Sequence, residues 1–360
     1  MHRVIRFAFL PLALLFVFGT SARAQDDEIK LKADLVTVTA AVRDRNQRPV
    51  KSLKAEDFAV YEDGVRQKIT HFAATEEPFS LLLLLDISGS TRDDIALIKR
   101  AARNFLTELR KEDRVGVIVF SGEVELIAEF SDKRSEVEAA IEAIATPGQE
   151  GDHRFNKKTG TSFYDALFLA VEDGPLGRVE GRKAIVCMSD GVDSTSKMDY
   201  RSVALMVEKS EASVYFLELN TEEATLANLL LPQTDPGYVN FSQSQINRYY
   251  DEFDRTSPNR FRHRKSLDAE TLREINKGLY EIARRDQVNL AERTGGRVYP
   301  VRALGDLAGV YSQVADDLRS QYSIGYYPEN DEADGRWRSI RVEVRAPGTT
   351  VRSRSGYWAK

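Results

Sequence analysis

A carboxylate and two hydroxyl groups directly follow an unbroken run of large aliphatic residues in this 360-residue sequence. The run covers residues 81–85, and the polar residues after it are Asp86, Ser88 and Ser90. Such a run is typical of a buried parallel strand. A strand of that kind brings the side chains after it to the carboxyl edge of its sheet, where open α/β proteins bind ligands. The chemistry that these residues offer is the donation of oxygen ligands.

Two downstream segments add oxygen atoms of the same kind. Thr161 follows Gly160 at the start of a helical stretch, and Asp190 ends a second apolar run at residues 184–188. Hard divalent cations take such all-oxygen ligand sets. We therefore predict a site for Mg²⁺, with Mn²⁺ or Ca²⁺ as alternatives, and its expected ligands are Asp86, Ser88, Ser90, Thr161 and Asp190. The alternative is local capping, with Asp86 ending its strand and Ser90 starting the next helix.

The elements that must position these residues alternate between strand and helix. We expect strands at 81–86, 115–120, 124–130, 184–189, 214–219 and 297–299, and helices at 93–109, 133–145, 161–172, 199–209, 268–293 and 304–319. This alternation predicts an α/β domain over residues 78–321 with a doubly wound, mostly parallel sheet. The connection around Gly122 is short enough only for a hairpin, which predicts one antiparallel edge strand.

Strand patterns without helices flank this domain on both sides. Residues 30–75 form an N-terminal β unit with hairpin-turn chemistry at residues 62–64, and residues 322–360 form a C-terminal β unit. Three strands are marginal alone. We expect the two units to pair into one small β-sandwich, with the α/β domain inserted between its halves. The alternative is two separate β appendages.

The order of the oxygen-bearing residues resembles the metal-ion-dependent adhesion site of von Willebrand factor type A (VWA) domains. That site has the pattern Asp-x-Ser-x-Ser, a distant Thr and a distant Asp, which here are Asp86, Ser88, Ser90, Thr161 and Asp190. The resemblance implies that the hydroxyl groups bind the cation directly and that the carboxylates act mainly through bound waters. It also implies that a carboxylate from a partner protein or peptide completes the coordination.

The resemblance extends over most of the chain. Residues 57–58, 62–64, 326–328 and 354–357 are similar to those of a secreted bacterial family of VWA-related proteins known largely from acidobacteria. Members of that family are mostly uncharacterised, so this similarity bears on fold and boundaries more than on function.

A long connection begins at the same sheet edge as the predicted ligands. It covers residues 220–266, whereas such junctions usually take about 2–6 residues. We expect an insertion that carries a partner-binding rim made of Tyr249, Tyr250, Arg260, Arg262 and Arg264. A flexible surface loop is the alternative. Replacing residues 222–262 by a short linker should then weaken partner capture and leave the fold and the Mg²⁺ affinity intact.

The first 24 residues are typical of a secretory signal peptide. Arg3 and Arg6 precede an apolar centre at residues 7–18, and residues 22–24 form a small-x-small cleavage site. The apolar centre is short for a bilayer span, so a membrane anchor is the alternative rather than the prediction. We expect a secreted or periplasmic protein without membrane insertion after cleavage. Cleavage removes three arginines and takes the net charge from −5 to −8, which argues against a nucleic-acid partner.

The sequence does not favour an enzyme. A phosphatase of the haloacid-dehalogenase type would use a carboxylate two positions after Asp86, where Ser88 stands. The four histidines have no neighbouring Ser or Cys that suggests a triad, and the single cysteine, Cys187, lies in an apolar run where a buried structural thiol is expected. We predict a metal-dependent protein-binding module. The alternatives are a structural domain with an unused metal site and a metal-dependent hydrolase.

Overall fold

The computed structural model describes residues 35–74, 77–145, 160–172, 174–231, 241–262 and 267–359. Residues 1–32 and 33–360 form two separate units, and every described residue belongs to the second unit. The predicted signal peptide lies outside the described residues. Within them, each helix is too short or too polar to span a bilayer.

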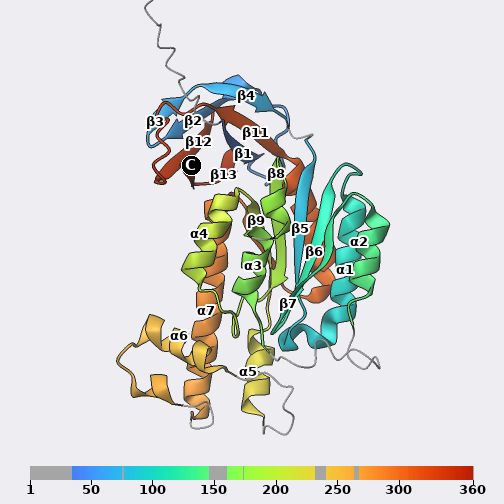
Figure 1. Ribbon diagram of the computed structural model, residues 1–360, viewed down its shortest axis with the longest axis vertical. Coiled ribbons are helices and arrows are strands. Elements are labelled where there is room, and N and C mark those ends of the chain that lie inside the picture. Colours follow the sequence, from blue (N-terminus) through green and yellow to red (C-terminus); the bar gives the residue numbers. More distant parts are fainter. Residues whose placement is uncertain are drawn as a thin grey trace, which may run out of the picture. The chain divides into compact units, whose positions relative to one another are not determined.

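A six-stranded sheet in the order β10-β9-β8-β5-β6-β7 forms the centre of the α/β domain (Figure 1). Its neighbouring strands are parallel except for β6 and β7, which form an antiparallel hairpin at the edge. The strands are β5 (Phe79–Asp86), β6 (Arg114–Phe120), β7 (Val124–Ser131), β8 (Arg182–Ser189), β9 (Ser213–Leu219) and β10 (Arg297–Val301). The predicted fold class is confirmed, including its single antiparallel edge strand.

Helices cover both faces of this sheet. One face packs against α1 (Ile95–Glu108), α2 (Arg134–Glu142) and α8 (Leu307–Arg319). The other packs against α3 (Phe163–Val171), α4 (Tyr200–Ser210) and the long α7 (Ala269–Thr294). Strand β5 is buried along its whole length and contributes to both cores. Its leucines therefore show no alternation with polar residues, which is the signature of a strand covered on two sides.

Two predicted helices begin later than the sequence suggests. The segments before α1 and α8 form 3-10 turns, η2 (Gly89–Asp94) and η6 (Leu304–Asp306). Turn η2 contains part of the predicted metal-binding motif, so the polar residues after β5 lie in a tight turn and not in a regular helix.

The strands outside the α/β domain form two four-stranded sheets, β13-β1-β11-β4 and β14-β12-β2-β3. The N-terminal strands are β1 (Val36–Arg43), β2 (Phe58–Glu62), β3 (Val65–Gln67) and β4 (Ile69–Ala73). The C-terminal strands are β11 (Gln321–Tyr326), β12 (Trp337–Val344), β13 (Thr350–Ser353) and β14 (Gly356–Trp358). Both sheets mix the two groups, because β1 pairs with β11 and β13 while β2 pairs with β12. Blue and red strands accordingly lie side by side in Figure 1.

One apolar core lies between these sheets, so they form a single β-sandwich. Val38 and Phe58 from the N-terminal strands pack with Tyr322, Ile324 and Val342 from the C-terminal strands. This shared core excludes two separate β appendages. The predicted hairpin turn is also present, with Asp63 at φ 46° and Gly64 at φ 83° between β2 and β3. Two successive positive φ values are what a type I′ hairpin requires.

A buried carboxylate joins the sandwich to the α/β domain. Asp317 of α8 is fully buried and forms ion pairs with Arg43 of β1 and Arg352 of β13, the latter at 2.7 Å. Tyr299 of β10 donates its hydroxyl to the same carboxylate at 2.5 Å. Although burial raises the pKa of Asp317, the guanidinium groups of Arg352 and Arg43 prevail and hold it below the usual 3.8. The contact therefore depends on an ionised carboxylate between two arginines.

Candidate metal centre

Asp86 stands at the carboxyl end of β5 and is fully buried. Both of its carboxylate oxygens accept hydrogen bonds: Oδ1 from the backbone N–H of Ser88 at 2.9 Å and Oδ2 from the hydroxyl of Ser189 at 2.6 Å. Thr91 fixes the following turn by donating its hydroxyl to the Asp86 carbonyl at 2.9 Å. The carboxylate therefore has one defined orientation.

The two motif serines face each other and the second carboxylate. Their Oγ atoms lie 3.2 Å apart, and Ser90 Oγ donates to Asp190 Oδ2 at 3.3 Å. Ser88 is the residue before η2, yet its side chain makes no capping hydrogen bond. Local capping therefore accounts for the Asp86 contact with the Ser88 N–H, but not for the direction of the serine hydroxyls.

Asp190 reaches the same place because β8 lies next to β5 and runs parallel to it. Its Oδ1 accepts the backbone N–H of Val192 at 2.9 Å, across a turn at Gly191. Gly191 has φ 74°, and a Cβ at this position would lie 2.3 Å from Nε2 of Gln287 on α7. Both the positive φ and the close approach of α7 require glycine after Asp190.

Thr161 is nearly buried, and its backbone is bound to the loop that follows Asp190. Its N–H donates to Ser194 Oγ at 2.7 Å, and its carbonyl accepts the N–H of Ser194 at 2.9 Å. The next N–H, of Ser162, donates to the carbonyl of Ser121 after β6 at 2.6 Å. Hydrogen bonds thus connect four predicted ligands in one chain, Asp86–Ser88–Ser90–Asp190. Thr161 is not part of this series of hydrogen bonds; it is bound to Ser194, which follows Asp190 by four residues.

The pKa values of both carboxyl groups are raised, which means that ionisation of each is disfavoured in the folded protein. Burial and the negative charge of Asp190 raise the pKa of Asp86 to about 7. Burial also raises the pKa of Asp190, against the hydrogen bonds from Thr221 and Val192 that lower it. A divalent cation would neutralise both charges, so the electrostatics of the pair fit such a ligand.

The donor set also fits. Within the described part of the chain, no group of three or more His, Cys, Asp and Glu side chains is placed to hold a metal. The hydroxyl groups are therefore needed to complete the ligands of any cation at Asp86 and Asp190, and neutral oxygen donors of this kind suit hard cations.

A family comparison agrees with this geometry. Residues 81–192 match the family described as von Willebrand factor type A domain. The chain contains a VWA domain. The matched region includes residues 81–86 of β5, all of β8 and all five predicted ligands, whereas the sandwich strands lie outside it. No curated protein sequence matches the chain.

Several solved structures are similar to parts of this chain. A conserved hypothetical protein, BatB, from Bacteroides thetaiotaomicron has 18% identity and a TM-score of 0.37, covering 67% of this chain and 98% of that one. Proximal thread matrix protein 1 from the mussel byssus, with a zinc-occupied MIDAS motif, has 11% identity and a TM-score of 0.43, covering 69% and 47%. A von Willebrand factor type A protein from Catenulispora acidiphila has 12% identity and a TM-score of 0.39, covering 91% and 63%.

The predicted partner-binding rim needs correction at its tyrosines. Residues 222–230 and 243–253 are not loop but helices, α5 (Glu222–Leu230) and α6 (Gln243–Phe253). Tyr250 is 5% exposed and packs in an apolar cluster between α6 and α7. The Tyr249 ring lies against Gly278 of α7 and Phe253. Both tyrosines thus pack between α6 and α7, and Tyr250 is not accessible to a partner.

The arginines of the predicted rim differ from one another. Arg260 pairs with Asp251 at 2.5 Å and lies beside the Phe261 ring, which is 80% exposed. Arg262 is exposed on the surface. Arg264 lies outside the described residues. Among the described rim residues, Arg262 thus remains accessible to a partner, next to the exposed Phe261.

Residues that sequence reasoning missed hold the carboxylates in place. Ser189 binds Asp86, and its position directly before Asp190 could have signalled it. Thr221 and Tyr280 bind Asp190. Tyr280 had no local signal, because it lies on α7, 90 residues beyond Asp190, and reaches the site only through the packing of that helix.

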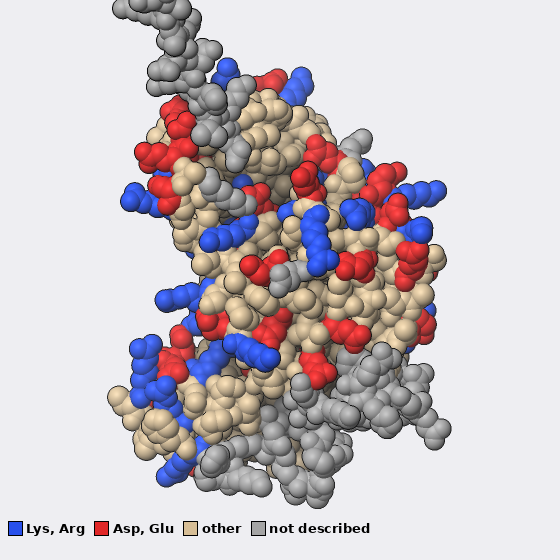
Figure 2. Space-filling view, viewed as in Figure 1, with Lys and Arg blue, Asp and Glu red and all other residues tan. Residues whose placement is uncertain are grey.

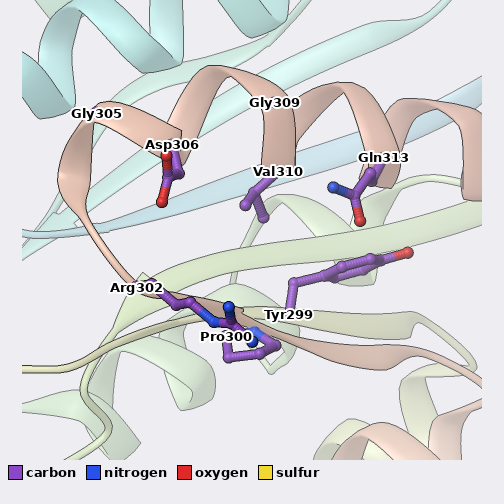
Figure 3. A pocket seen from close by; sticks show the side chains of 8 residues that line it. All are labelled: Tyr299, Pro300, Arg302, Gly305, Asp306, Gly309, Val310 and Gln313. Carbon is purple, nitrogen blue, oxygen red and sulfur yellow. The ribbon is translucent and has the colours of Figure 1, made fainter.

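A separate pocket of about 580 Å³ lies between β10 and the start of α8 (Figure 3). Its lining is mixed in character and consists of Tyr299, Pro300, Arg302, Gly305, Asp306, Gly309, Val310 and Gln313. A Cβ at Gly305 or Gly309 would meet no atom within 4 Å, so the space beside both glycines is open. None of the five predicted metal ligands lines it, so the pocket and the metal centre are distinct features.

Proposed function

We propose that this chain is an exported VWA module that binds a divalent cation and uses it to capture an acidic residue of a partner protein or peptide. The observation that carries the proposal is the hydrogen-bonded chain from Asp86 through Ser88 and Ser90 to Asp190 at the carboxyl edge of the sheet. Two buried carboxylates beside three hydroxyl ligands favour a hard cation, and Mg²⁺ is the one we propose first.

The five residues would contribute to cation binding in two ways. Ser88, Ser90 and Thr161 would offer neutral oxygen ligands, while Asp86 and Asp190 would supply negative charge mainly through bound waters. The cation, when bound, would supply a strong electrophilic centre for an outside carboxylate. Protein groups already bind both oxygens of Asp86, which supports an orienting and charge-balancing role for this carboxylate.

Surface charge is consistent with a protein ligand. In the face shown in Figure 2, acidic and basic side chains are interspersed, and no broad basic region covers the domain. A nucleic-acid partner would call for such a region. Export rests on the signal-peptide pattern of residues 1–24, and we propose a secreted or periplasmic location and no catalytic role.

Metal binding is the first test. Purified mature protein is expected to bind Mg²⁺ or Mn²⁺ in isothermal titration calorimetry, and the double variant Ser88→Ala, Ser90→Ala is expected to lose this binding, because it removes two ligands. Ser52→Ala, at an exposed position in the sandwich, is the matched control and should bind as the wild type does. Equal heats from the wild type and the double variant would reject the site.

Partner capture is the second test. In pull-downs from native membranes and secreted material, Mg²⁺ should be required for capture, and a chelator should release the captured protein. The variant Ser88→Ala, Ser90→Ala should capture nothing above background, since a partner carboxylate has no cation to bind. Capture that survives both the chelator and the double substitution would contradict a metal-bridged contact.

A further inference from the structure

Three hydroxyl groups from different elements converge on one oxygen of Asp190. Thr221, just before α5, donates to Asp190 Oδ2 at 2.5 Å, and Ser90 donates at 3.3 Å. Tyr280 of α7 contributes a longer bond at 3.4 Å, and its hydroxyl also contacts Thr221 at 2.8 Å. Thr225 of α5 touches Tyr280 at 2.9 Å. Only one of these four groups belongs to the metal-binding motif.

A second set of hydrogen bonds reaches Thr161 from α6. Ser242 and Ser244, at the start of α6, both donate their hydroxyls to the carbonyl of Ser194, at 2.8 and 3.0 Å. Ser194 in turn accepts the N–H of Thr161. Thr221 and the start of α6 thus both contact the loop after β8 that carries Asp190, and through Ser194 this loop is bound to Thr161.

Helix α6 is itself firmly attached. Arg248 pairs with the buried carboxylate of Asp286 on α7 at 2.6 Å and donates to the hydroxyl of Tyr164 on α3. Tyr250 and Ile246 add apolar contacts to α7. The described helices of the insertion are therefore part of the packed domain, and their contacts with the site are held in place by α7.

We propose that Thr221 and Tyr280 are positioning residues of the metal centre, and that their hydrogen bonds to Asp190 set its affinity for the cation. The inference rests on the proposed function and deepens it. Groups that hydrogen-bond a ligand fix its orientation, and their loss weakens metal sites by about 10–100-fold. Thr221 and Tyr280 both lie outside residues 222–262, so the sequence-based expectation that this segment can be replaced without loss of Mg²⁺ affinity stays a separate prediction.

The test compares single hydroxyl deletions by Mg²⁺ calorimetry on the mature protein. Thr221→Val and Tyr280→Phe keep nearly the same shape and are expected to raise the Kd by about 10–100-fold. Thr225→Val is the matched control, since Thr225 contacts Tyr280 but not Asp190, and its Kd should match the wild type. Thr221→Ser keeps the hydroxyl and should restore tight binding. Unfolding midpoints in chelator verify that each variant folds.

The possible results separate the two ideas. Absence of Mg²⁺ binding by the wild type would overturn the proposed function and this inference together. Binding by the wild type with an unchanged Kd in both Thr221→Val and Tyr280→Phe would overturn the inference and leave the metal site standing. Weak binding by Thr221→Ser would also overturn it, because the lost methyl packing would then be the cause. If one deletion does not fold, the other carries the same comparison.

Discussion

Replacing Asp317 by asparagine is expected to lower the free energy of unfolding by about 3–5 kcal/mol, the usual cost of breaking a buried ion pair from one side. The substitution leaves the guanidinium groups of Arg43 and Arg352 without a charge partner at the junction of the sandwich and α8. It also changes the acceptor of the Tyr299 hydroxyl. Urea unfolding followed by circular dichroism measures the loss. The neighbouring Asp316→Asn is the matched control, because Asp316 is exposed on the same helix, and it should change little.

The pH dependence of the unfolding free energy provides a second test of this prediction. The pKa of Asp317 is lower in the folded protein than in the unfolded chain, so its contribution is fully present above pH ~4 and is lost as the pH falls through the folded value. The wild type should therefore lose more unfolding free energy than Asp317→Asn on acidification from pH ~5 to pH ~3. Parallel losses in the two proteins would show that the carboxylate is not held ionised by the arginines.

The sequence was sufficient wherever a local pattern had one physical explanation. Five consecutive leucines that end directly in polar residues are typical of a short strand covered on both faces, and β5 is such a strand. The two terminal β units each had too few strands to bury their apolar faces alone, and their pairing across β1 and β11 resolves that shortage. For the same reason, the polar residues after β5 and β8 could be expected at one edge of the sheet.

Long-range contacts between side chains were beyond such reasoning. Tyr250 lies in a polar, arginine-containing segment that resembles a recognition surface, yet its spacing from Ile246 places both on the buried face of α6. Tyr280 and Asp317 carry no local mark of their roles, because each binds side chains of other elements: Asp190 in the case of Tyr280, and Arg43 and Arg352 in the case of Asp317. Nothing in sequence periodicity reports which polar groups of two packed elements will meet.

Replacing Asp86 by asparagine is expected to stabilise the metal-free protein but to weaken its binding of Mg²⁺. Without a cation, the free energy of unfolding at pH ~8 should rise by more than about 1 kcal/mol, the equivalent of one pKa unit. Burial and the charge of Asp190 raise the pKa of Asp86 to about 7, so its ionised form costs the folded protein stability at higher pH. Asparagine removes that charge. Its Oδ1 can still accept the Ser88 N–H, and the Ser189 hydroxyl can turn to accept from the amide.

With excess Mg²⁺, the wild type should become more stable than Asp86→Asn. Binding to the folded state raises the unfolding midpoint of the wild type by mass action, whereas Asp86→Asn lacks the negative charge that attracts the cation and should gain little. Thermal unfolding in chelator and in Mg²⁺ measures both effects, with the exposed helix-capping change Asp199→Asn as the control. A variant less stable than the wild type in chelator would show that the charge of Asp86 is already compensated without metal. An equal Mg²⁺ shift in both proteins would place the cation elsewhere, because a site built around two repelling carboxylates cannot lose one of them without losing its attraction for the ion.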